Sequence, residues 1–412
     1  MFEKKAVFLL TAVLAANFAG CATYQDQVRE SRQLISSGNA EQSLGKFQEL
    51  ANKEDGDQLV HLLDYGVALQ IANKYPESNQ ILLRSDKLAD ELDYLSVSRL
   101  AGSLLTSEEV SLYKGDTFEK IFINAFLAMN YLQIGNLDDA LVETRRMNEK
   151  YVKLRGENKK KFELNPFAKY LSALIWEANG DWDDAYIAYK ESFELSQNIA
   201  TIKEDLIRSA KKSRRLDDYN EWKKKFPDVI ENPDWYDKGK GELIIIYQQG
   251  WGPRKTYDRS SPRFPTLQPT FNQTEKAELN IQGQKSFISQ QIYNVESAAI
   301  QTLMDDRAAL VGKRVGGIVA KEIVADQIRQ KDELLGFIAW IFFYASDRAD
   351  LRQWSLLPQT IHIIRVPLKP GQYEYSLKGL DFGGKPTSEN LNNQSVQIKA
   401  GKKVFRIWRS LQ

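Results

Sequence analysis

Residues 113–147 constrain the fold of this chain more than any other stretch, because their pattern predicts two antiparallel helices. Apolar residues recur at helical spacing in the first half, with the small residues Ala125 and Ala128 among them. Gly135 interrupts this run, and a second amphipathic helix is predicted to begin at Asp138. Small side chains at such places let two helices approach closely. The chain is therefore expected to contain closely packed helical hairpins.

Turn signals recur through the first half of the chain at intervals typical of helical repeats. They fall near Gly38, Asn73, Gly135 and Gly180. The first two lie about 35 residues apart, and a basic polar insert at 153–163 lengthens the last interval to about 45. The spacing N-Y-L-x-x-G-x-x-x-x-A, from Asn130 to Ala140, resembles a tetratricopeptide (TPR) hairpin. This resemblance implies a TPR-like α-solenoid, in which stacked hairpins form a surface that binds partners.

A change of composition divides the chain into two predicted domains. The TPR-like helical repeat domain is expected over 31–225, and the proline-containing stretch 226–240 begins a C-terminal α+β domain over 226–412. That domain is predicted to contain antiparallel strands at 242–247, 277–282, 360–366, 373–377, 395–399 and 404–408. The first of these, ELIIIY, is expected to be buried on both faces. Turns at 369–372 and 400–402 predict two hairpins at the edge of a small β-sandwich.

Between these strands, residues 295–345 return to a helical pattern that ends in the apolar segment 334–345. Twelve residues span about 18 Å as a helix, whereas the hydrocarbon core of a bilayer is about 30 Å thick, so this segment is too short to cross it. We expect a buried central helix. The alternative is an element that contacts lipid or a partner, for which Trp340 and Tyr344 are suitable interfacial residues.

The N-terminus has the form of a secretory signal peptide over residues 1–20, with two lysines, an apolar run and small residues before Cys21. The end of this run, F-A-G-C, resembles a bacterial lipobox, which implies cleavage before Cys21 and a lipid on its thiol. Residues 21–30 would form the lipid-anchored tether. Ala22 after the cysteine implies sorting to the outer membrane. The alternative is a plain cleaved signal with an incidental cysteine.

Composition argues against nucleic-acid binding and catalysis. The 56 basic and 55 acidic residues give a net charge of +1, without the basic surplus that phosphate backbones require. Only two histidines exist, His61 and His362, so a histidine-based metal site or triad has few candidates. Acidic pairs such as Asp138-Asp139 follow turns and suit helix N-termini. We therefore expect no enzyme, no catalytic residue, no metal site and no cofactor apart from the covalent lipid.

Four residues of the hairpin 113–147 are the candidate partner-binding residues. They are Tyr131, Glu143, Arg145 and Arg146. Glu143 and Arg146 stand three positions apart on the second helix and can pair with each other. The functional alternative is an arginine that presents its planar guanidinium to a carboxylate of a partner.

Several stretches together resemble an uncharacterised bacterial lipoprotein family with TPR repeats. They are the lipobox, YKGDTFEK, NYLQIGNLDDALVETRR, GELIIIYQQGWGPRK and ADLRQWSLLP. The resemblance implies a lipoprotein on the periplasmic side of the outer membrane that acts as a scaffold for another envelope protein or peptide. The alternative is a membrane-active, secretion or envelope-assembly component whose segment 334–345 contacts lipid or a pore.

Overall fold

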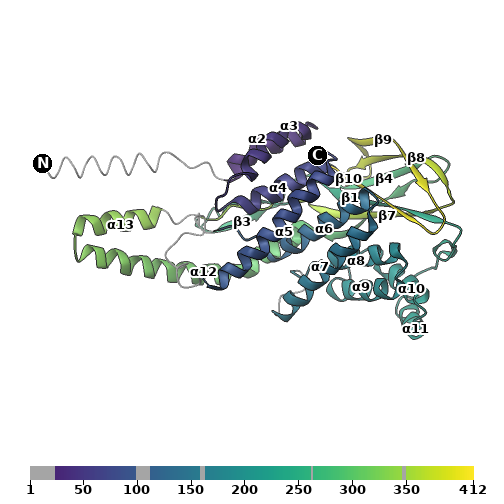
Figure 1. Ribbon diagram of the computed structural model, residues 1–412, viewed down its shortest axis with the longest axis horizontal. Helices are drawn as coiled ribbons and strands as arrows, with labels where there is room; N and C mark the ends of the chain where they lie inside the picture. Colours follow the sequence, from purple (N-terminus) through teal and green to yellow (C-terminus); the bar gives the residue numbers. More distant parts are fainter. Residues whose placement is uncertain (1–23, 99–111, 158–162, 261–262, 346–348) are drawn as a thin grey trace.

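The computed structural model describes residues 24–98, 112–157, 163–260, 263–345 and 349–412 (Figure 1). The predicted signal peptide 1–20 and the lipidation site Cys21 lie outside these ranges. Helices fill the first half of the described chain. Strands and a long helical hairpin make up the second half.

Ten helices of the described chain, α2 to α11, form five consecutive hairpins. Their bounds are α2 Tyr24–Ser36, α3 Ala40–Ala51, α4 Gln58–Ile71, α5 Tyr75–Ser98, α6 Thr117–Gln133, α7 Leu137–Gly156, α8 Pro166–Asn179, α9 Trp182–Leu195, α10 Ile202–Lys212 and α11 Leu216–Lys225. Each hairpin turns at a residue with positive φ, and these residues are Gly38, Asn73, Gly135, Gly180 and Arg214. The four predicted turns are therefore confirmed. A residue in this conformation ends one helix and lets the next run back against it.

Close helix contacts occur where small residues stand. Ala125 and Ala128 are fully buried in α6, which confirms the predicted face. Gly66 of α4 has Leu82 of α5 directly above it, and a Cβ at this position would lie 2.6 Å from the leucine Cδ2. The spacing of the hairpins is irregular because α5 has 24 residues and α7 has 20, against 10 to 14 in α8 to α11.

Helix α2 begins at Tyr24, so the predicted tether 21–30 is wrong from that residue onward. Tyr24 and Val28 are buried, and the Tyr24 hydroxyl donates a hydrogen bond to Asp64 in α4. The sequence YQDQV reads as polar, but its two apolar side chains lie one helical turn apart on the same face. Burial of this face makes α2 part of the helical body.

Within the described ranges, the strands form two four-stranded sheets and one separate two-stranded sheet. Their bounds are β1 Gly241–Gln249, β2 Arg254–Tyr257, β3 Pro265–Gln268, β4 Lys276–Ile281, β5 Phe287–Ile288, β6 Gln290–Asn294, β7 Thr360–Leu368, β8 Gly371–Leu380, β9 Pro386–Ile398 and β10 Lys403–Arg409. The first sheet has the order β10-β1-β7-β6, the second has the order β5-β4-β8-β9, and β2 pairs with β3. All predicted strands are present.

The connections between these strands differ from the two hairpins that the sequence predicts at the turns 369–372 and 400–402. The turn after β7 and the turn after β9 each carry the chain from one sheet to the other, and the hairpin is instead β8–β9. Strand β10 pairs with β1 in parallel, so the antiparallel expectation for 404–408 is wrong. The reason lies at Gly401, whose N–H donates to the Lys240 carbonyl at 2.9 Å and brings the chain to the start of β1. A Cβ at Gly241 would collide there with the Lys399 and Lys402 carbonyls.

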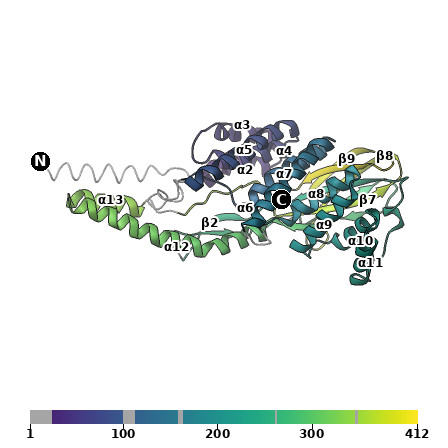
Figure 2. The ribbon, with the colours of Figure 1, turned by 60° about the horizontal axis from the view of Figure 1, so that its bottom comes forward.

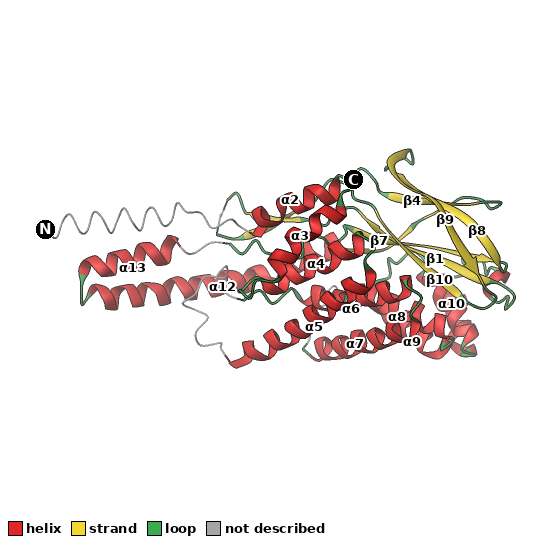
Figure 3. Ribbon diagram, turned by 45° about the horizontal axis from the view of Figure 1, so that its top comes forward, coloured by secondary structure: helices red, strands yellow, loops and turns green. Residues whose placement is uncertain are grey.

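The first sheet lies between the helices and the second sheet (Figure 3). On β1, Ile244 and Ile246 belong to the core shared with the helices, whereas Leu243 and Ile245 belong to the core between the sheets. The predicted burial of β1 on both faces is therefore confirmed. A hydrophobic core that crosses residue 226 also joins the helical repeats and the α+β part into one body.

A helical hairpin projects from this body (Figure 2). It consists of α12, Val295–Arg329, and α13, Glu333–Ala345, and α13 folds back where Gly336 lies against the Arg329 backbone. The expected buried central helix is wrong, because Leu334, Leu335, Phe337 and Trp340 are 38 to 52 % exposed. No helix in the described ranges has the length and apolar character needed to span a bilayer.

Candidate functional site

The extended segment 349–358, ADLRQWSLLP, lies against the helical repeats and is mostly buried. Trp354 is 1 % exposed, and its ring lies 5.3 Å from that of Phe126 in α6. The segment follows α13 and leads into β7, so it is far in sequence from the helices that it contacts. Two buried carboxylates of those helices bind its backbone.

The first of these carboxylates is Asp64 of α4. It accepts hydrogen bonds from the Ser355 hydroxyl at 2.6 Å and from the Leu356 N–H at 3.0 Å, in addition to Tyr24. Burial raises the pKa of Asp64 to about 6, although these hydrogen bonds and the nearby Arg32 favour its charged form. At neutral pH Asp64 is thus a buried carboxylate, and the segment supplies two of its three hydrogen-bond donors.

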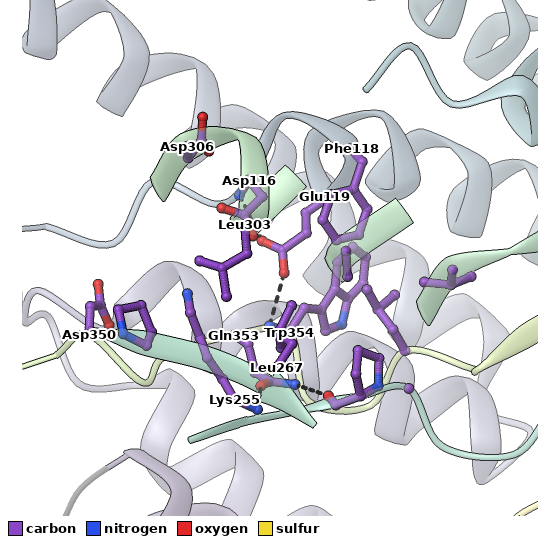
Figure 4. Close-up of a pocket in the computed structure, with 16 residues that line it drawn as sticks. Asp116, Phe118, Glu119, Lys255, Leu267, Leu303, Asp306, Asp350, Gln353 and Trp354 are labelled. Carbon is purple, nitrogen blue, oxygen red and sulfur yellow. Dashed lines mark hydrogen bonds between the residues drawn. The ribbon is translucent and has the colours of Figure 1, made fainter. Parts of the chain in front are cut away.

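The second carboxylate is Glu119, at the start of α6. It closes a capping box with Asp116, accepts from the Tyr113 hydroxyl at 2.6 Å and accepts from the Trp354 N–H at 3.1 Å (Figure 4). Burial, followed by the neighbouring Asp116, raises the pKa of Glu119 to about 7. The D-T-F-E spacing is a recognisable helix-start signal in the sequence. Its contact with Trp354 has no such signal.

Arg352 ties the segment to the helical repeats through charge. Its guanidinium donates to Asp57 at 2.8 Å and to Asp350 at 2.7 Å, and it lies 5.5 Å from the centre of the Tyr113 ring. Burial alone would lower the pKa of Arg352, but the two carboxylates raise it above its ordinary value. This face of the repeats is occupied by the chain itself.

A cavity of about 220 Å³ lies beside this segment (Figure 4). Carboxylates of Asp116, Glu119, Asp306 and Asp350 line it, together with Lys255 and apolar side chains. Glu119 and Asp350 already serve the capping box and Arg352. Within the described ranges, no group of three or more His, Cys, Asp or Glu side chains is placed to bind a metal ion.

The two histidines lie in different parts of the fold. His61 is in α4, and His362 in β7 contacts the Ser289 hydroxyl at 3.1 Å and the Thr360 hydroxyl at 2.8 Å. Burial lowers the pKa of His61, and it lowers the pKa of His362 to about 4. Both side chains are therefore neutral at pH 7.

The four candidate partner-binding residues have different environments. Glu143 is 2 % exposed and accepts from Asn124 at 2.8 Å, and Arg146 pairs with it at 3.3 Å as its spacing predicts. Arg145 is exposed above the Trp176 ring, and Tyr131 is half-buried. The guanidinium of Arg146 is thus engaged within the protein. Of the two arginines, Arg145 presents more of its side chain to solvent.

Comparison with known proteins gives neither a family model nor a curated protein that matches this chain. Among solved structures, MamA 41-end from Desulfovibrio magneticus RS-1 is 16 % identical, with a TM-score of 0.31 over 48 % of this chain and 89 % of that chain. A Podosopora anserina putative kinesin light chain with TPR-like repeats is 11 % identical, with a TM-score of 0.35 over 50 % and 93 %.

These similarities are distant and cover about half of this chain. The fold itself defines the class of protein: a helical-repeat protein whose hairpins pack on an α+β part. The presence of the helical repeats and of an α+β part is as predicted.

Proposed function

We propose that this protein is a protein-binding scaffold of the bacterial cell envelope, held at the outer membrane by a lipid on Cys21 and facing the periplasm. The lipobox-like sequence before Cys21 supports the anchor. Tyr24, where α2 begins, follows Cys21 by three residues, which span at most about 10 Å. The folded body would therefore lie close to the membrane surface.

The exposed apolar face of α13 is the observation that carries the scaffold proposal. Leu334, Leu335 and Phe337 are about half exposed, and Trp340 is 38 % exposed. Large apolar side chains gathered on one projecting element mark interaction sites more often than isolated ones do. Tryptophan and phenylalanine also supply large contact areas with few rotatable bonds. We therefore assign the main partner contact to the α12–α13 hairpin rather than to the repeat face covered by segment 349–358.

The charges at the tip of the hairpin favour a protein partner. Five charged residues lie close together there: Asp326, Arg329, Lys331, Asp332 and Glu333. Moving such a tip into hydrocarbon is unfavourable, whereas a protein surface can pair these charges around an apolar contact. At 1.5 Å per residue, the 35 residues of α12 span about 52 Å, so the hairpin can reach a partner well beyond the body.

Site-specific photo-crosslinking in cells tests this assignment. A photoreactive residue at Phe337 is expected to crosslink one envelope protein, and the same residue at Phe382 on the β8–β9 turn, which is 94 % exposed, serves as the matched control. Identical crosslinking from both positions, or none from Phe337, would contradict the scaffold proposal. Arg145 provides a second position, which reports whether the predicted surface of α7 takes part.

A second function is favoured by the composition of α13: a membrane-active component whose hairpin contacts lipid. Residues 334–345 carry no charge, and Trp340 suits a membrane interface. The Cys21→Ser protein separates the two functions. A scaffold is expected to be monodisperse without detergent and to stay apart from vesicles of phosphatidylethanolamine and phosphatidylglycerol. Vesicle binding that Phe337→Glu abolishes would instead support the membrane function.

A further inference from the structure

A cleft of about 350 Å³ opens where the α8–α9 turn, α10, the linker before β1 and the β9–β10 turn meet. It is unrelated to segment 349–358 and to the α12–α13 hairpin. Basic side chains outnumber acidic ones in its lining, and Trp182 and Trp235 contribute aromatic rings. A concave, charged surface with aromatic walls is a form of site that binds small polar molecules.

Four residues that line the cleft, Glu177, Arg208, Glu242 and Lys403, belong to a buried network of balanced charge. It contains three acids and three bases: Glu177, Asp205, Glu242, Arg208, Arg365 and Lys403. Burial by itself would raise the pKa of Glu177, but three neighbouring cations outweigh it and hold that pKa well below its usual range. Because these charges neutralise one another, the network supports the shape of the cleft but adds no net charge to it. The net charge of the cleft therefore comes from the residues at its rim.

The rim of the cleft has an excess of positive charge. Four lysines, Lys212, Lys238, Lys240 and Lys402, face two aspartates, Asp234 and Asp237. Lys240 pairs with Asp234 at 2.6 Å, whereas Lys212, Lys238 and Lys402 form no ion pair with any described residue. Burial lowers the pKa of Lys212, and the charge of Lys403 lowers it further. An anion placed among these ammonium groups would relieve their mutual repulsion.

One buried donor at the cleft also lacks a partner. Arg208, which lines the cleft and is 4 % exposed, has an Nε with no hydrogen-bond acceptor among the described residues. Buried donors without acceptors are uncommon in folded proteins because each costs about 1–3 kcal/mol. This Nε is itself enclosed by the protein, so the lysines of the rim are the groups that an anion in the cleft can reach.

From this geometry we propose that the cleft is a binding site for a phosphate-bearing molecule, held by the ammonium groups of Lys212, Lys238 and Lys402 at its rim. Lysine ammonium groups bind phosphate oxygens as compact charges with several donors. The phosphate can belong to a soluble molecule or to a lipid headgroup. The site needs no contribution from a scaffold partner.

Calorimetric titration of the purified protein with inorganic pyrophosphate at constant ionic strength tests the site. Saturable binding of one pyrophosphate per chain is expected, and Lys212→Ala and the more exposed Lys402→Ala are each expected to weaken it about fivefold or more. Lys224→Ala is the matched control, because it removes one exposed lysine of α11 outside the cleft and is expected to change affinity less than about twofold. Melting temperatures establish that each variant is folded.

A second arm identifies the source of the phosphate. Flotation with vesicles that contain phosphatidic acid, lost in Lys402→Ala, would show that a lipid headgroup is bound, whereas pyrophosphate binding without flotation would show a soluble ligand. Absence of both kinds of binding would overturn the proposal. Equal weakening by Lys224→Ala would overturn it too, since the attraction would then be a diffuse effect of net charge.

Discussion

Segment 349–358 and helix α13 show opposite relations between sequence and burial. The segment ADLRQWSLLP carries two charged residues, Asp350 and Arg352, and yet Arg352 and Trp354 are at most 4 % exposed. Residues 334–345 carry no charge, and yet Phe337 is 52 % exposed. The difference teaches that hydropathy alone does not decide which part of this chain is inside.

Partners decide it instead. The charged segment is buried because Asp57, Asp64 and Glu119 on the helices satisfy its guanidinium, hydroxyl and N–H groups. A buried polar group that has its hydrogen bonds avoids most of the cost of leaving water. Among the described elements, helix α13 makes its main contacts with α12, and Leu334, Leu335 and Phe337 remain exposed. Five substitutions test this comparison, and Ala128→Arg is expected to have the largest effect.

Ala128→Arg is expected to prevent folding of the whole body. Ala128 is fully buried, and an unpaired charge there costs several kcal/mol, which is comparable to the total stability of a domain. The core shared with β1 means that the sheets should unfold together with the repeats. Circular dichroism at 222 nm and thermal melting measure the loss. Val142→Arg, at a site 40 % exposed on α7, is the control. Melting temperatures equal to that of the wild type in both variants would mean that the buried face of α6 is wrongly assigned.

Trp354→Ala and Trp340→Ala make the same chemical change in the two contrasted regions. The first removes a fully packed ring and should lower the free energy of unfolding by about 3–5 kcal/mol. The second acts on an exposed side chain and should change it by about 0.5 kcal/mol or less. Urea unfolding gives both values. Similar losses in the two variants would remove the contrast between segment and hairpin.

Asp64→Asn should lower stability by about 1–3 kcal/mol, because three donors lose their carboxylate acceptor. The loss of stability caused by Asp64→Asn should depend on pH. The folded-state pKa of Asp64, about 6, is above its ordinary 3.8. The stabilisation that Asp64 contributes to the folded wild-type protein is therefore complete below pH 3.8 and declines as pH rises through 6. The gap in melting temperature between wild type and variant should therefore narrow from pH 4.5 to pH 7.5. The two histidines and Glu119 titrate in both proteins and largely cancel, and a gap that widens instead would contradict the assignment.

Ser355→Ala removes one of these donors and should cost about 1 kcal/mol. Loss of this hydrogen bond to the charged form should also raise the pKa of Asp64 further. Differential scanning calorimetry is sensitive enough for such a shift. Ser37→Ala, in the exposed α2–α3 turn, is the control and should leave the melting temperature unchanged.

Local signals in the sequence predicted much of the fold. The positive-φ turns at Gly38 and Gly180, the small residues of α6 and the buried run of β1 were all readable, because each depends on a few neighbouring residues. The pairing of β10 with β1 was not readable, since a turn that changes sheets looks like a hairpin turn until both sheets are known. The Asp64 contact joins residues about 290 positions apart, and it has no local signature.

By itself, the sequence determined that this chain forms helical hairpins followed by strands, because helical periodicity, turn residues and β-branched runs act over short distances. Only the tertiary structure decided that the repeats share a core with the first sheet, that segment 349–358 covers them, and that α13 stays exposed. Those outcomes depend on which surfaces pack together. Packing between distant parts of the chain is determined by the total apolar area buried and by the hydrogen bonds formed, and no single residue determines it.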